Sequence, residues 1–148
     1  MPTLISFLMF VFVVVQQPSG YYSYVSNDLA TVTQYQSGFG IRLMAHAEMA
    51  GSAFSRLRIG DEIKLDKKTF IVADIWKYRT MFADGTNPPA DTIAFMGADG
   101  IGITGFELYN RLNIRDALIL QTCFDGVKGR LFVIAYPETI MDKRTDTK

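Results

Sequence analysis

Short apolar runs separated by turn residues dominate this sequence, and little of it has the length or the period of a long helix. The runs are rich in Val, Ile, Thr and aromatic residues, which favour β-strands, while the Gly, Pro and polar residues between them favour turns. Such a pattern predicts an all-β barrel or sandwich. The runs that we expect to contain strands are residues 21–36, 39–46, 59–65, 68–78, 117–123 and 130–135.

Charge and cysteine content argue against several classes of function. The chain has 148 residues, of which 15 are basic and 15 acidic, so its formal net charge is zero. No basic stripe is visible, and we therefore expect no nucleic-acid partner. The sequence holds one histidine and one cysteine, with no CxxC motif or Cys/His cluster, so we expect no zinc site. The length suits one domain.

The N-terminal segment, residues 1–17, contains no charged residue and is almost wholly apolar over 4–15. As a helix, such a run spans about 18 Å, less than the hydrocarbon core of a bilayer at about 30 Å. The length suits the apolar core of a signal peptide, which would export the protein or tether it to a membrane. The alternative is a buried strand, because Phe, Val and Ile favour strands. We expect a folded domain at 18–140 and a polar tail at 141–148.

Two short helices and one long loop are expected between the strands. Residues 47–57 place apolar side chains at helical spacing, and 106–113 are expected to form a helical turn. Residues 83–105 contain two adjacent prolines and many glycines, which predicts a long mobile loop of the kind that often carries function. The side chains that would form the apolar face of the first helix are Met49, Ala53, Phe54 and Leu57.

Acidic side chains in or near this loop are the candidates for a metal site. Asp84, Asp91 and Asp99 offer the oxygen ligands that Ca²⁺ prefers. Polar loops are commonly acidic, so residue type alone does not establish a calcium site. No other cofactor is expected.

The cysteine lies where the last two expected strands would form a hairpin. Side chains alternate along a strand, so Gln121 and Cys123 share one face, and Leu120 and Thr122 share the other. The sequence FDGVKG follows the cysteine and contains two glycines suited to a reversal. If Cys123 pairs with Arg130, their Cβ atoms lie about 4.5–5.5 Å apart on one face. A one-residue slip in register would place them on opposite faces.

These residue types suit nucleophilic catalysis. A neighbouring cation lowers the pKa of a thiol, and arginine offers a rigid fork of donors to a carbonyl oxygen. Cleavage of an amide also needs a proton donor for the leaving amine, a role that histidine can fill. The chain offers one such pair, Cys123 and His46. Taken alone, each residue more often has a structural role: a buried inert thiol, a structural histidine, and a surface charge at Arg130.

Three segments together match the pattern of one family. Residues 43–65 contain an apolar strand ending in histidine, a short helix and a strand of the form L..GD.I.L; LQTC stands at 120–123; and GRLFVIAYP, with its arginine, at 129–137. In this order they resemble the histidine segment, the TLxTC signature and the arginine strand of sortases, the cysteine transpeptidases of Gram-positive cell surfaces. The resemblance covers roughly residues 38–137. It implies a compact closed β-barrel of about eight strands with one or two short helices.

The resemblance also implies a role for each candidate residue. Cys123 would be the nucleophile, His46 the general acid, and Arg130 the residue that holds the substrate carbonyl or its oxyanion. No metal would be needed for the chemistry. The residues placed against the substrate by the same resemblance are Leu120, Thr122 and Ala47.

The implied activity is cleavage of an LPxTG-like sorting peptide between Thr and Gly, through a thioacyl-enzyme that an amine resolves. The partners would be a peptide or protein with a sorting motif and an amine acceptor, and the location would be extracellular or at the cell surface. Two alternatives remain: a non-catalytic sortase-fold module of a cell surface or virion, and a cysteine endopeptidase that uses water. Elsewhere, Arg42 is expected to be exposed, and Trp76 and Tyr78 to lie in the core or barrel wall.

Overall fold

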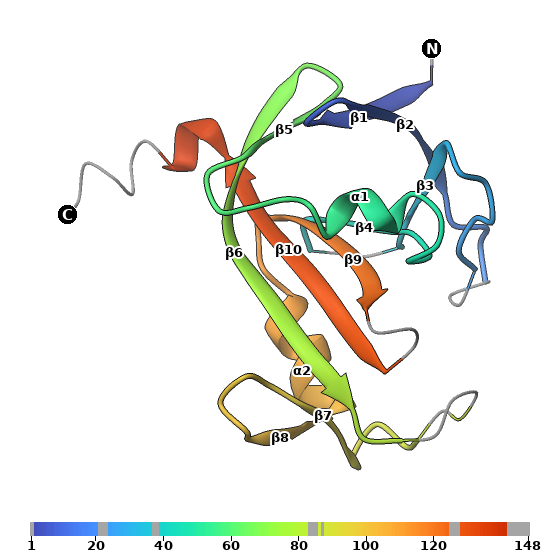
Figure 1. Cartoon of the computed structure of the whole chain (residues 1–148), viewed down its shortest axis with the longest axis vertical. Helices are drawn as coiled ribbons and strands as arrows, with labels where there is room; N and C mark the ends of the chain where they lie inside the picture. The colour runs from blue at the N-terminus through green and yellow to red at the C-terminus, as the bar shows by residue number, and fades with distance from the viewer. Residues whose placement is uncertain are drawn as a thin grey trace.

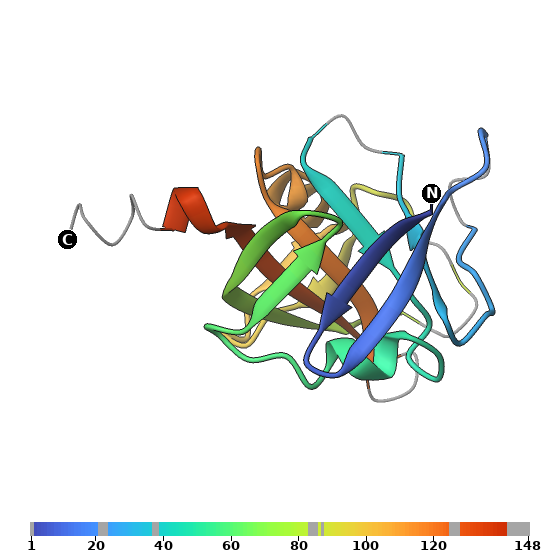
Figure 2. The same cartoon turned by 90° about the horizontal axis from the view of Figure 1, so that it is seen from above.

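The computed structural model describes residues 2–20, 24–36, 39–82, 86, 88–124 and 128–141. A helical stretch at 138–141 projects away from the rest of the fold (Figure 2). Within these residues the elements follow one another as β1 (Thr3–Phe7), β2 (Phe10–Gln16), β3 (Thr31–Gln34), β4 (Ile41–Met44), α1 (Gly51–Phe54), β5 (Glu62–Leu65), β6 (Lys68–Thr80), β7 (Ile93–Met96), β8 (Gly102–Thr104), α2 (Gly105–Leu112), β9 (Leu118–Phe124) and β10 (Gly129–Pro137) (Figure 1).

Eight of the strands close into a barrel. Neighbouring strands follow the order β10, β9, β4, β3, β2, β1, β5 and β6, and β6 pairs with β10 to complete the ring. The β2–β3 and β4–β9 pairs are parallel, and the other pairs are antiparallel. The β7–β8 hairpin extends the sheet from the end of β6. The prediction of a compact closed barrel of about eight strands with short helices is confirmed.

The apolar N-terminal run forms β1 and β2, which pair with each other and make the front wall of the barrel in Figure 2. Ile5 and Phe7 on β1, and Phe12 and Val14 on β2, are buried in the interior, and the side chains between them face outward. The strand alternative is therefore the one that the structure shows. The expected boundary after residue 17 does not separate this segment from the barrel domain. In the part of the chain described above, no helix is both long and apolar enough to span a membrane.

Two apolar clusters hold the fold together. One fills the barrel interior, and the other lies outside, between β6, β9, β10 and the helix α2 (Figure 1). Because both faces of β9 and β10 are covered, these strands are apolar on both sides rather than alternating with polar residues. Trp76 and Tyr78 belong to this outer contact, in the barrel wall as predicted. The buried members of the outer cluster are Tyr78, Ile103, Leu108, Leu112, Ala117, Ile119, Phe132 and Ile134.

Both expected helices form, with different lengths from those predicted. The helix α1 covers only four residues, starting at Gly51, although Ala53, Phe54 and Leu57 bury the apolar face expected of it. The helix α2 begins with a capping box, in which the Thr104 hydroxyl accepts from the backbone N–H of Glu107 at 3.0 Å. This cap satisfies backbone donors at the helix start.

The segment 83–105 is not one long loop, contrary to expectation. Its second half forms the β7–β8 hairpin, which buries Ala94 and Ile103. The Phe95 ring also packs edge-on against Phe82, with ring centroids 5.7 Å apart. The long strand β6 provides the edge on which β7 pairs, and so a glycine-rich sequence becomes ordered there.

Candidate active site

Cys123 and Arg130 lie opposite each other in the β9–β10 hairpin, which is the register that places their side chains on one face. Arg130 also pairs with Tyr78 of β6, so the three residues form one row across three strands. Paired residues in antiparallel strands direct their side chains to the same face. Cys123 is a free, half-buried thiol, and the half-buried Arg130 donates from Nη1 to the Gly129 carbonyl at 3.1 Å.

The strand β4 brings His46 to the same end of the barrel. It runs parallel to β9, and beyond its last paired residue the Ala45 N–H donates to the Gln121 carbonyl at 3.2 Å. The buried Thr122 hydroxyl donates to the Ala45 carbonyl at 2.7 Å. His46 and Cys123 each follow one residue later, beyond the last pair of the β4–β9 ladder, so both lie at this end of the two strands. Ala45 points into the barrel and alternation turns His46 outward, where its side chain is exposed.

A tight turn between β4 and α1 fixes the backbone of His46. Its carbonyl accepts from the N–H of Met49 at 2.9 Å and from that of Gly51 at 3.1 Å. Gly51 packs so closely that an added Cβ would lie 2.6 Å from the His46 carbonyl oxygen. The sequence places a glycine here because any larger residue would push the helix away from the strand end.

The three predicted substrate contacts have different positions. Leu120 is fully buried in the barrel interior, and Thr122 is buried with its hydroxyl bonded to the carbonyl of Ala45, just after β4. Both therefore point away from the face of β9 that carries Cys123. They pack on the interior side of the strand, behind the candidate site. Ala47 is half-buried in the turn that follows His46, and it remains a candidate for substrate contact.

Arg42 on β4 is half-buried, which corrects the expectation that it is exposed. Its guanidinium lies 3.8 Å from the ring centroid of Tyr35 and 5.8 Å from that of Tyr109. Burial lowers the pKa of Arg42, while the two tyrosines act in the opposite direction. The Arg42 Nε is buried without a hydrogen-bond partner.

Gln121 lies two residues before Cys123 and on the same face of β9. Its Oε1 is also buried without a hydrogen-bond partner. Reasoning from sequence assigned no functional role to Gln121 or Arg42. Strand alternation could have drawn attention to them. Arg42 is four residues before His46 and Gln121 is two residues before Cys123, so each shares a strand face with that candidate residue. Both side chains therefore belong to the outward face of the barrel wall, the face that also carries Cys123.

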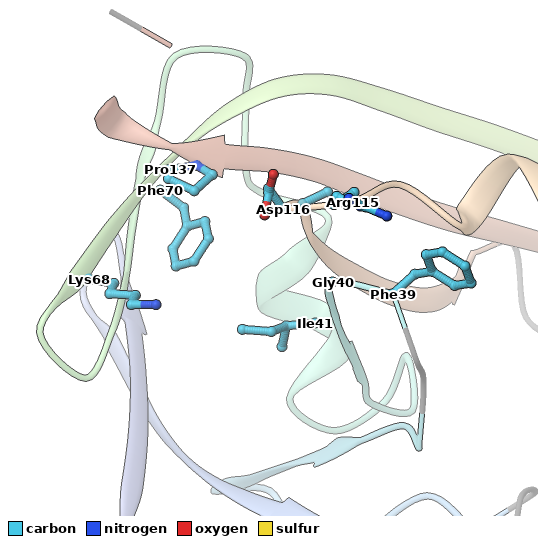
Figure 3. A pocket seen from close by; sticks show the side chains of 9 residues that line it. Phe39, Gly40, Ile41, Lys68, Phe70, Arg115, Asp116 and Pro137 are labelled. Atoms are coloured by element: carbon cyan, nitrogen blue, oxygen red, sulfur yellow. The ribbon is translucent and has the colours of Figure 1, made fainter. Parts of the chain in front are cut away.

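A hollow of about 400 Å³ lies at the opposite end of the barrel (Figure 3). It touches Pro137 at the end of β10, Lys68 at the start of β6 and Ala117 just before β9. Arg130 begins β10 and Cys123 ends β9, so the hollow is separated from them by the length of these strands. Its other charged lining residues are Arg115 and Asp116.

The acidic candidates do not gather into a metal site in the described part of the chain, where no three His, Cys, Asp or Glu side chains come together. Asp84 lies outside the described residues. Asp91 is exposed, and the Asp99 carboxylate accepts from the Ile101 N–H at 3.0 Å within a turn. Asp99 thus serves the β7–β8 connection.

Solved structures with a similar fold are sortases. Sortase A of Listeria monocytogenes matches with a TM-score of 0.59 and 16% identity, over 92% of this chain and 86% of that one. The lid mutant of Streptococcus agalactiae sortase C1 matches with a TM-score of 0.54 and 12% identity, over 91% and 68%. A sortase D5 transpeptidase of Clostridium perfringens matches with a TM-score of 0.53 and 14% identity, over 92% and 78%.

The protein therefore has the sortase fold across about nine-tenths of its length. No protein-family model matches the sequence, and no curated protein matches it. At these low identities the similarity concerns the fold, so the activity has to be argued from the residues of this chain.

Proposed function

We propose that this protein is a sortase-like cysteine transpeptidase, with Cys123 as nucleophile, His46 as general acid and Arg130 as the residue that holds the substrate carbonyl. The observation that carries the proposal is the pairing of Cys123 with Arg130, beside the strand that leads to His46. The sortase fold supports it, and the neighbouring strands β4, β9 and β10 lead to or carry the three residues in this chain. Thr122 supports the site through its hydrogen bond to the Ala45 carbonyl, and Gly51 lets α1 pack closely against the same backbone.

In the first step, the Cys123 thiolate attacks the carbonyl carbon of the scissile amide, a C–S bond forms and the C–N bond breaks. Protonated His46 gives its proton to the departing amine. Arg130 stabilises the negative charge that develops on the carbonyl oxygen. In the second step, an amine attacks the thioester and a new amide forms. The Cys123 thiolate leaves, and the proton released by the amine returns to His46.

The substrate class that fits this chemistry is a peptide with an LPxTG-like sorting signal, cleaved between Thr and Gly. The acceptor is a primary amine carried by a second peptide or a cell-surface polymer. We infer that the protein works where such substrates are displayed, outside the cell or at its surface. The resemblance of LQTC to the TLxTC signature supports this assignment.

A product assay tests the proposal. The full-length protein is incubated with a labelled LPxTG-type peptide and excess triglycine, and the products are separated by chromatography and identified by mass. Wild type should form the triglycine adduct of the peptide. Cys123→Ala should form none, and His46→Ala and Arg130→Ala should be slower by about 100-fold or more. The matched control is Arg115→Ala, which removes an exposed arginine at the far end of the barrel and should keep the wild-type rate.

The product also separates the proposal from its alternatives. Release of the peptide acid alone, in the presence of triglycine, would identify a hydrolytic cysteine endopeptidase. No turnover in wild type, with all variants indistinguishable from it, would contradict catalysis and leave a sortase-fold binding module.

A further inference from the structure

The long strand β6 has one edge that is only partly paired. Its other edge pairs with β10 along most of its length, while this edge pairs with β5 over residues 68–71 and with β7 over 79–80. The Val72 backbone extends the contact with the β5 side by two hydrogen bonds. Within the described part of the chain, no strand pairs with this edge over residues 73–78, which we call the free edge (Figure 1).

The hydrogen-bond pattern decides which backbone groups point to the free edge. The Thr80 N–H donates to the Lys128 carbonyl at 2.9 Å, so the Thr80 backbone is directed to the β10 side. In an antiparallel pair, such residues alternate with residues whose N–H and C=O point the other way. The backbone groups of Ile75 and Lys77 therefore point to the free edge. The Asp74 carboxylate accepts from the Ile75 N–H at 2.9 Å, which leaves the Lys77 N–H and both carbonyls for a partner.

A hollow lies beside the free edge on each face of the sheet. One, of about 280 Å³, is lined by Trp76 and Tyr78, and the other, of about 560 Å³, by Lys77 and Arg79. Side chains alternate along β6, so these two pairs of residues belong to opposite faces. The lining residues that the two hollows share are Lys77, Gly97 and Ala98.

The larger hollow is apolar apart from two cations. The Phe124 ring covers Gly129, and its centroid lies 5.8 Å from the Lys77 Nζ. Met96 adds a second large apolar side chain. Lys77 and Arg79 are exposed, and no Asp or Glu among the described residues lines this hollow. An acidic side chain that enters it would pack on apolar groups and bring its carboxylate to the cations.

An added strand fits these features. Its backbone would bond to the Lys77 N–H and to the two carbonyls, and its alternate side chains would enter the two hollows. A second copy of this chain fits less well, because pairing two of these short edges brings the cations of both copies close together. A side chain of opposite charge across from Lys77 is stabilising instead.

We propose that the free edge of β6 binds an extended, acidic segment of a partner protein as an added strand, with an Asp or Glu side chain opposite Lys77 in the larger hollow. This inference goes beyond the proposed function and does not depend on catalysis. Phe124 directly follows Cys123, so a bound segment would lie near the end of β9 that carries the candidate nucleophile.

Selection from a peptide library tests the acidic preference. Short peptides randomised over all natural amino acids are passed over immobilised full-length protein carrying Cys123→Ala, so that no captured peptide is cleaved. Bound peptides are sequenced by mass spectrometry. Asp and Glu should be enriched about threefold or more over Asn and Gln at one position, next to residues that favour strands.

Variants at position 77 assign this preference to one side chain. Lys77→Gln should lose most of it, and Lys77→Glu should select Lys and Arg at the same position. The matched control is Lys67→Glu, which reverses an exposed charge in the turn before β6 and should keep the acidic preference. Raising the salt from about 0.05 M to about 0.5 M should weaken the preference of the protein with Lys77.

N-methylation of a selected peptide tests the strand pairing. A strand added to β6 directs every second N–H to β6 and the others to solvent. Methyl groups on the first set should weaken binding about tenfold, while methyl groups on the second set should change it by less than about twofold. The affinity of each labelled peptide is measured by fluorescence anisotropy.

The outcomes separate this proposal from the proposed catalysis. Selection of no peptide above a heat-denatured control would overturn the binding site, as would the absence of an acidic preference or its persistence in Lys77→Glu. Equal effects of the two methyl sets would contradict strand pairing. The salt comparison and the methyl series retain Lys77, so they decide the question even if a variant does not fold. Because the protein used lacks the Cys123 thiol, binding stands or fails independently of thioacyl-enzyme formation in wild type.

Discussion

Replacing Gly51 with alanine tests how closely α1 packs against the strand end that leads to His46. An ideal Cβ at this position would overlap the Thr122 hydroxyl and lie 2.6 Å from the His46 carbonyl oxygen and 2.8 Å from that of Ala45. Real Cβ atoms almost never approach other heavy atoms within 3.0 Å. The start of α1 and the end of β4 would therefore have to move apart.

The expected loss of stability follows from these contacts. Overpacking of a rigid site costs about 1–3 kcal/mol. Disrupting the bond from Thr122 to the Ala45 carbonyl leaves a buried acceptor unpaired, which costs about 1–3 kcal/mol more. Alanine favours a helix over glycine by about 1 kcal/mol, which opposes these terms. We expect a net loss of about 1–5 kcal/mol in the free energy of unfolding.

Urea unfolding, followed by the fluorescence of the single tryptophan, Trp76, measures this loss. The matched control is Gly105→Ala, which also replaces the first residue of a helix. An added Cβ at Gly105 would meet its nearest atoms at 3.7 Å, an ordinary contact. This control should be as stable as wild type or gain up to about 1 kcal/mol. If Gly51→Ala behaves like Gly105→Ala, the close packing beneath the site is refuted.

Three further substitutions test other parts of the fold, each by its urea midpoint. Thr122→Val should lower stability by about 1–3 kcal/mol, because the Ala45 carbonyl loses its buried donor, and Thr122→Ser should restore most of this. Gly40→Ala should lower it by more than about 1 kcal/mol, since Gly40 has a φ of +55° and an added Cβ would lie 2.6 Å from the Ala117 carbonyl oxygen. Thr104→Ala should cost about 1 kcal/mol through the lost cap of α2. Wild-type stability in any of these variants would contradict the contact concerned.

The hairpin around Cys123 was predictable because its signals are local. Apolar runs on either side of a short glycine-containing stretch fix a reversal, and strand alternation then decides which side chains share a face. These two rules leave the register open, and the structure shows the one in which Cys123 pairs with Arg130. The prediction of a closed barrel rests on the resemblance to sortases. The short apolar runs alone are equally compatible with a β-sandwich.

The N-terminal hairpin could not be recognised from its sequence. Its turn is formed by Leu8 and Met9. Both residues are apolar, so the hydrophobic run continues through the turn without a break. Leu8 adopts a φ of +54°, a conformation usually associated with glycine or asparagine, and Met9 is 97% exposed. Without a polar or glycine turn signal, two strands of a barrel wall looked like one apolar segment.

The catalytic roles of the candidate site residues stay predictions. The resemblance to sortases indicated Cys123, Arg130 and His46, but the position of the strand that leads to His46 depends on the parallel pairing of β4 and β9, which are far apart in sequence. The inward orientation of Leu120 and Thr122 follows from the strand face that carries Cys123. Arg42 was misjudged because the contribution of α2, through Tyr109, is a tertiary effect.

Intact-mass measurement of the full-length protein during reaction with an LPxTG-type peptide is the most direct test of the proposed site. Samples quenched in acid within the first turnovers should gain the mass of the peptide fragment ending in Thr, and peptide mapping should locate it on Cys123. The gain should be absent in Cys123→Ala and strongly delayed in Arg130→Ala. An unmodified wild-type mass at every time point, or an acyl group on another residue, would contradict the account.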